Sequence, residues 1–146
     1  MCSRAEPALC QAIMLSDNVI VEQGTRKMSL INCFTHFNAH TIPFTPPSFF
    51  VTVFFTNLND DLREMDLVAR IETDSAHVLA SRDTRVKLEK DSPPLDRDSI
   101  LNVTFPFGVT FPLAGRFHVC VVLNKEELGR RPFMVMEATD AASAGQ

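Results

Sequence analysis

The segment Phe49-Phe50-Val51-Thr52-Val53-Phe54-Phe55 decides the fold class of this chain. Its β-branched and aromatic residues predict a β-strand, and because they are apolar on both faces we expect the strand to be packed on at least one side. Short apolar segments of the same kind recur along the chain, separated by Pro, Gly, Asn and Asp. No segment carries a helical stripe over a dozen residues. The pattern therefore predicts an all-β protein.

The strand-length segments are numerous and close together. With no helix between them to carry parallel crossovers, roughly seven to ten strands favour an antiparallel β-sandwich of the immunoglobulin or C2 kind. A closed β-barrel is the alternative, since the sequence does not show whether the last strand pairs with the first. We expect the strands at Gln11–Leu15, Val19–Glu22, Met28–Phe37, Phe49–Asn57, Asp66–Thr73, His77–Ala80, Thr84–Glu89, Ser99–Phe105, Arg116–Asn124 and Arg131–Glu137, some of them merging.

Length and charge limit the classes of function. A chain of 146 residues is the size of one domain, which we place at residues 11–137, with an N-terminal extension at 1–10 and a flexible tail at 138–146. The net charge of -4 argues against a nucleic-acid partner, which would need a basic patch to neutralise phosphates. No run approaches the roughly 20 apolar residues of a membrane span, and no secretory signal is recognisable. These features predict a cytoplasmic protein.

Cysteine and histidine residues do not form a recognisable metal or redox motif. The four cysteines are irregularly spaced, without a C-x-x-C pair. Cys33 and Cys120 lie on strands placed like those that carry the disulfide of immunoglobulin domains, but the chain has no Trp or Tyr to complete that arrangement, so we expect buried, reduced thiols. His36 and His40 have the spacing of zinc ligands on a helix, whereas a strand would separate them by about 13 Å. Together these patterns predict no metal and no cofactor.

One acidic loop offers a different kind of function. Asn57, Asn59, Asp60 and Asp61 supply the hard oxygen ligands that calcium prefers at the tips of sandwich domains, and an ordinary turn explains them equally well. A calcium- or small-ligand-binding domain is therefore the alternative function. Nucleophile elbows, phosphate loops and H-E-x-x-H motifs are all missing, so the sequence favours a protein that is not an enzyme.

The Phe-rich strand is the main indication of an interface. If Phe49, Val51, Val53 and Phe55 fill the core, then Phe50 and Phe54 lie on the opposite face. Such a face is covered internally, by the loop around Ile42–Phe44 or by Phe105–Phe107, or it contacts another protein. We interpret the chain as a non-enzymatic module that acts through protein contacts, including self-association through Phe50 and Phe54.

Turns and core positions also resemble a known group of proteins. The passages Leu15–Val21 and Lys27–Phe34 resemble a first hairpin, Pro47–Val51 resembles the entry to the next strand, and Phe111–Phe117 with Arg130–Phe133 resembles a closing hairpin. On these passages the chain is similar to a family of small, uncharacterised bacterial β-sandwich proteins. The resemblance implies the fold and a bacterial cytoplasmic origin, and it implies no active site.

Overall fold

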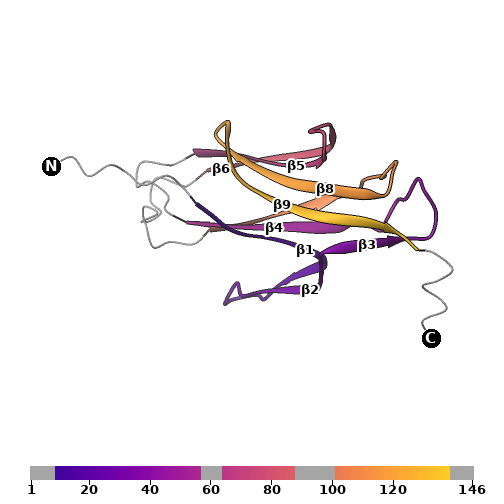
Figure 1. The fold of residues 1–146 in the computed structure, drawn as a ribbon. Coiled ribbons are helices and arrows are strands. Elements are labelled where there is room, and N and C mark those ends of the chain that lie inside the picture. Colours follow the sequence, from indigo (N-terminus) through magenta and orange to yellow (C-terminus); the bar gives the residue numbers. More distant parts are fainter. Residues whose placement is uncertain (1–8, 57–63, 88–100, 139–146) are drawn as a thin grey trace.

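The structure, a computed structural model, describes residues 9–56, 64–87 and 101–138, and Figure 1 shows them as strands joined by loops. Nine strands form in this part of the chain, and no helix does. They are β1 (Leu9–Val21), β2 (Met28–Phe34), β3 (His36–Ala39), β4 (Phe49–Thr56), β5 (Glu64–Thr73), β6 (Val78–Lys87), β7 (Leu101–Phe107), β8 (Gly115–Leu123) and β9 (Glu126–Glu137).

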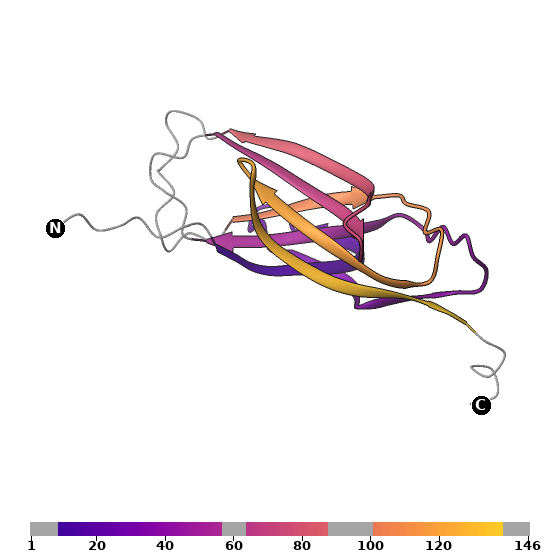
Figure 2. The ribbon, with the colours of Figure 1, turned by 45° about the horizontal axis from the view of Figure 1, so that its top comes forward.

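The strands form two sheets that pack face to face (Figure 2). Sheet A has the order β2-β1-β4-β7, and sheet B has the order β3-β9-β8-β5-β6. All strand pairs are antiparallel except β3 with β9, which run parallel. The prediction of a β-sandwich is confirmed, and the described strands do not close into the alternative barrel.

The core lies between the inner faces of the two sheets. In β4 the predicted alternation is confirmed, because Phe49, Val51, Val53 and Phe55 are all buried. The inner face of β8 meets them with residues that alternate in the same way: Phe117, Val119, Val121 and Leu123. At about 25 cal/mol per Å² of apolar surface removed from water, this burial is the main favourable contribution to folding.

Phenylalanine rings fill the end of the sandwich nearest the start of β4. Phe37 of β3 lies 5.2 Å from Phe49 and 5.6 Å from Phe111, measured between ring centroids. The segment 40–48, which crosses from sheet B to sheet A, joins this end through paired backbone hydrogen bonds between Phe44 and Phe111. The proline-rich residues Pro43–Pro47 therefore lie in a crossover between the two sheets.

Several strand boundaries differ from the prediction. The segments predicted at Gln11–Leu15 and Val19–Glu22 form one strand, β1, which bends, and Figure 1 shows the far half of its hairpin with β2 turned away from sheet B. The segment predicted as Met28–Phe37 is two strands, because the chain leaves sheet A after Phe34 and joins sheet B at His36. The hairpin that joins β8 to β9 has a turn of only two residues, Asn124 and Lys125, and both have a positive φ, 47° and 72°.

β1 of sheet A and β9 of sheet B approach each other at one side of the sandwich. The first half of β1 pairs only with β4, and Gly129 of β9 lies so close to it that a Cβ atom there would be 3.0 Å from the Cys10 Cβ. Arg131 bridges the two sheets, because its guanidinium donates a hydrogen bond to the backbone carbonyl of Ile13. This contact satisfies an acceptor on the unpaired edge of β1.

Candidate functional site

The outer face of sheet A, which we call the uncharged face, is the surface that the sequence singled out. Strand register places Phe54 beside Ala12 and Asn102, and Phe50 beside Ser16 and Pro106. The guanidinium of Arg131, on β9, reaches the edge of this face at the Met14 Sδ, 3.4 Å away. The described residues that sheet A itself contributes to this face include no Asp, Glu, Lys or Arg. They are Ala12, Met14, Ser16, Asn18, Ile20, Ser29, Ile31, Cys33, Phe50, Thr52, Phe54, Asn102, Thr104 and Pro106.

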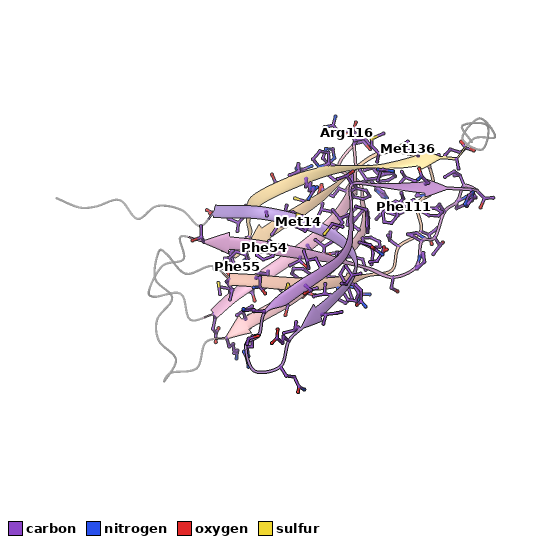
Figure 3. The ribbon with its side chains drawn as sticks, turned by 90° about the horizontal axis from the view of Figure 1, so that it is seen from below. Met14, Phe54, Phe55, Phe111, Arg116 and Met136 are labelled. Atoms are coloured by element: carbon purple, nitrogen blue, oxygen red, sulfur yellow. The ribbon has the colours of Figure 1, made fainter. Side chains whose placement is uncertain are left out.

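The two phenylalanines of the uncharged face are half-buried. Figure 3, which looks at the molecule from this side, shows Met14 and Phe54 close together on neighbouring strands. Large side chains on this face shield the smaller ones between them. Thr52 is therefore fully buried although it points away from the core. Its hydroxyl oxygen lies 3.1 Å from that of Thr104. The strand register places Phe50 and Phe54 on the face opposite the core, as predicted.

The two segments considered as internal cover for these rings, Ile42–Phe44 and Phe105–Phe107, pack elsewhere. Ile42 and Phe44 pack against the core cluster, and the Phe44 ring is 6.0 Å from Phe37 at the end of the sandwich. Phe105 and Phe107 are buried on the inner side of β7, so Pro106 is the residue of this segment that lies beside Phe50. Of the two alternatives for this face, internal cover by these segments is therefore not what the described residues show, because one segment packs at the end of the sandwich and the other is part of β7.

The outer face of sheet B has the opposite character. Charged residues pair across its strands: Arg85 with Asp66 at 2.9 Å, and Lys87 with Glu64 at 3.7 Å. The hydrogen bond from Arg85 holds the pKa of the Asp66 carboxyl below its ordinary value. Exposed pairs of this kind contribute little to stability, but they keep this face hydrated. The two outer faces of the sandwich therefore differ sharply in charge.

A buried thiol lies in the middle of the charged face. Strand register aligns Arg70, Cys120 and Arg130, and the Cys120 Sγ donates a hydrogen bond of 2.6 Å to Glu127. Nitrogen atoms of Arg70 and Arg130 lie 3.7 Å and 3.6 Å from the same sulfur. Glu72, only 3% exposed, pairs with both arginines at 3.6 Å and 3.5 Å.

Electrostatics keep this thiol in its neutral form. Burial and the hydrogen bond to Glu127 raise the pKa of Cys120, while the hydrogen bond from Arg130 lowers the pKa of Glu127. A thiol with a raised pKa is a poor nucleophile and a poor metal ligand at neutral pH. The cluster therefore joins three strands through ion pairs and has no arrangement suited to covalent catalysis. Sequence reasoning missed it, because only strand pairing brings these residues together.

The other predicted cysteine and histidine positions are dispersed. Cys33 is exposed on the uncharged face while Cys120 is buried on the charged face, so the expectation that both thiols are buried was wrong for Cys33. His118 lies 3.7 Å from Asp74, measured between Nδ1 and Oδ1, and His36 is exposed on β3. Within the described ranges, no three His, Cys, Asp or Glu residues are placed to hold a metal ion.

A shallow pocket of about 270 Å³ lies at the corner between β2 and β3. Polar groups of Asp17, Asn32, His36 and Asn38 line one part of it, and Phe37, Phe44 and two prolines line the rest. The loop at Asn57–Asp61, which carries the calcium candidates Asn59, Asp60 and Asp61, lies outside the described residues.

Comparison with known families identifies the group to which the chain is related. A family model described as a family of unknown function, DUF6941, matches residues 11–136. The chain belongs to this family. Membership of DUF6941 agrees with the predicted resemblance to an uncharacterised family. No match is found among curated proteins.

Solved structures similar to this DUF6941 member are distant and diverse. They include an immunoglobulin-like protein from Pseudomonas aeruginosa, with 12% identity and a TM-score of 0.39 over 91% of this chain and 99% of that one. A family 2 glycosyl hydrolase from Bacteroides cellulosilyticus has 17% identity and a TM-score of 0.45 over 69% of this chain and 15% of its own. An alkylpurine DNA glycosylase from Pseudomonas fluorescens has 13% identity and a TM-score of 0.46, and this chain spans 31% of its length.

Across the described ranges, no helix is long and apolar enough to cross a membrane.

Proposed function

We propose that this chain is a non-enzymatic β-sandwich module that acts through protein contacts made by the uncharged face. The observation that carries the proposal is the contrast between the two outer faces: one is crowded with ion pairs, and the other has no charged residue among the described ones that sheet A contributes. Depletion of charge at the centre of a patch, with aromatic residues and Met enriched, is typical of protein interfaces.

The half-buried rings supply the anchors of this contact. Phe50, Phe54 and Met14 occupy adjacent positions on β4 and β1, so a partner that covers them removes a continuous apolar surface from water. Fully burying an exposed side chain of this kind contributes roughly 1.5–3 kcal/mol, so covering the exposed part of each half-buried ring contributes a fraction of that. Because no protein partner is specified by this surface, self-association is the form of contact that can be tested with the chain alone.

The test is the molar mass in solution, measured by light scattering over a wide concentration range. We expect the wild-type chain to associate, and Phe54→Ser and Phe50→Ser to dissociate at concentrations where the wild type does not. Val122→Ser is the matched control, because Val122 is a half-buried apolar residue on the outer face of sheet B. Circular dichroism and thermal unfolding of each variant separate lost association from lost folding.

Two results would contradict the proposal. One is a folded Phe54→Ser variant that associates as strongly as the wild type. The other is a wild-type chain that stays monomeric at high concentration and retains no protein partner.

A further inference from the structure

The four edge strands of the two described sheets are protected to different degrees. An edge strand exposes a row of unpaired N–H and C=O groups, and native proteins shield such edges with charges, prolines, bulges or short length. β6 carries Arg82, Asp83, Arg85 and Lys87, β7 contains Pro106, and β3 has only four residues. β2 has seven residues, Met-Ser-Leu-Ile-Asn-Cys-Phe, with neither a charge nor a proline.

The far half of the β1–β2 hairpin is also the part of sheet A that exposes most apolar surface. Ile20 and Val21 of β1 are 53% and 54% exposed, and Ile31 of β2 is 37% exposed. Asn32 of β2 has a positive φ of 54°, and Figure 1 shows the far half of the β1–β2 hairpin turned away from sheet B. The edge from Met28 to Ile31 therefore stands clear of the other described strands, with its outer backbone groups free to pair.

We infer that the edge of β2 from Met28 to Ile31 is the docking site for a second copy of this chain, which pairs with it antiparallel about a two-fold axis. A bare strand edge is complementary to itself in this geometry, because each N–H row meets a C=O row of the other copy. No charged residue lies between Met28 and Phe34, so two copies meet without like-charge repulsion. Ile31, exposed on the outer face of β2, then lies at the junction between the two copies.

Pairing at this edge would extend the surface used by the proposed function, on which this inference rests. β2 lies beside β1, and β1 lies beside β4, so Ile31 belongs to the same outer face as Phe54. Two copies joined through β2 share one continuous sheet, and their uncharged faces lie side by side. Edge pairing and contact through the phenylalanines are separate interactions, so each can fail without the other.

The test introduces the charge that this edge lacks. In Ile31→Lys a lysine enters the edge of each copy, and we expect the dissociation constant of the dimer to rise about tenfold or more. Val78→Lys is the matched control, because Val78 is β-branched, 42% exposed and located on the other long edge strand, β6. Light scattering compares both variants with the wild type and with Phe54→Ser.

Cys33 lies two residues beyond Ile31 on the same strand and also belongs to the uncharged face, so its reactivity is measured in Phe54→Ser as well, where contact through the phenylalanines is removed. It is exposed, whereas Cys120 is buried, so a maleimide should modify Cys33 readily in the monomer. We expect its modification rate, followed by peptide mass mapping, to fall several-fold at concentrations where the wild type dimerises. In Ile31→Lys the rate should not depend on concentration.

The outcomes separate the two proposals. Dimers lost in Ile31→Lys and kept in Val78→Lys support edge pairing. If they also persist in Phe54→Ser, edge pairing stands and self-association through the phenylalanines fails. Dimers that survive Ile31→Lys, or that form without slowing the reaction of Cys33, overturn edge pairing, and their loss in Phe54→Ser would then leave the proposed function intact. A wild-type chain that is monomeric at every concentration also overturns edge pairing.

Discussion

Phe111 should be one of the costliest residues to truncate in the molecule. It is fully buried, and its ring centroid lies 4.9 Å from that of Phe117, 5.6 Å from Phe37 and 5.8 Å from Phe133. Phe111→Ala removes the ring from the centre of this cluster, where rings from three strands leave little room for collapse. Truncations of this kind destabilise by about 3–5 kcal/mol, through lost burial and the cavity that remains. Phe111→Leu keeps most of the volume and should cost less, about 1–1.5 kcal/mol.

Urea denaturation measures these differences, followed by circular dichroism because the chain has no Trp and no Tyr to report by fluorescence. With a slope of about 2 kcal/mol per molar urea, a loss of about 4 kcal/mol moves the midpoint of Phe111→Ala by about 2 M. Leu113 is the matched control, since it lies two residues further along the same segment and is 69% exposed. Leu113→Ala should stay within about 0.5 kcal/mol of the wild type. The packing argument is refuted if Phe111→Ala loses less than about 1 kcal/mol, or if Leu113→Ala loses as much.

Two further predictions concern the close approach of β1 to β9 and the buried thiol. In urea denaturation, Gly129→Val should lower the free energy of unfolding by about 1–3 kcal/mol, because a new Cβ would be 3.0 Å from the Cys10 Cβ. Gly108→Val is the control and should cause no such loss, because no atom lies within 4 Å of its Cβ position. Equal losses in the two variants would contradict the clash. Because the pKa of Cys120 is raised in the folded state, the folded chain keeps the thiol proton to higher pH than the unfolded chain does. The free energy of unfolding therefore keeps its full value at neutral pH and falls as the pH rises above about 8.5, where the unfolded thiol loses its proton. Thermal unfolding against pH should show this loss in the wild type and a flatter profile in Cys120→Ala, and parallel profiles would show that Cys120 is not the group responsible.

Much of the fold follows from short-range patterns in the sequence. Alternation in Phe49–Phe55 correctly separated the core residues from Phe50 and Phe54, because side chains of a strand point alternately to its two faces whatever the strand pairs with. The same local rule accounts for the buried positions Phe117, Val119, Val121 and Leu123 of β8. The proline-rich crossover was also predictable, since a proline cannot donate to a sheet ladder.

Strand boundaries were less predictable where tertiary contacts override the pattern. The segment Met28–Phe37 reads as one apolar strand, but it divides because its first part pairs with β1 in sheet A and its end pairs with β9 in sheet B. The polar interval between the segments predicted at His77–Ala80 and Thr84–Glu89 is likewise no break, because β6 runs along the edge of sheet B with charged side chains in solvent.

Composition and local alternation by themselves determined an all-β sandwich, the faces of its central strands and the two outward-facing phenylalanines. Only the tertiary structure decided which distant residues share a surface: that Arg70, Cys120 and Arg130 form one row across three strands, and that β2 ends sheet A as an uncharged edge. The physical reason is that the direction of a side chain depends on its own strand, whereas register and strand order depend on hydrogen bonds between segments far apart in the chain.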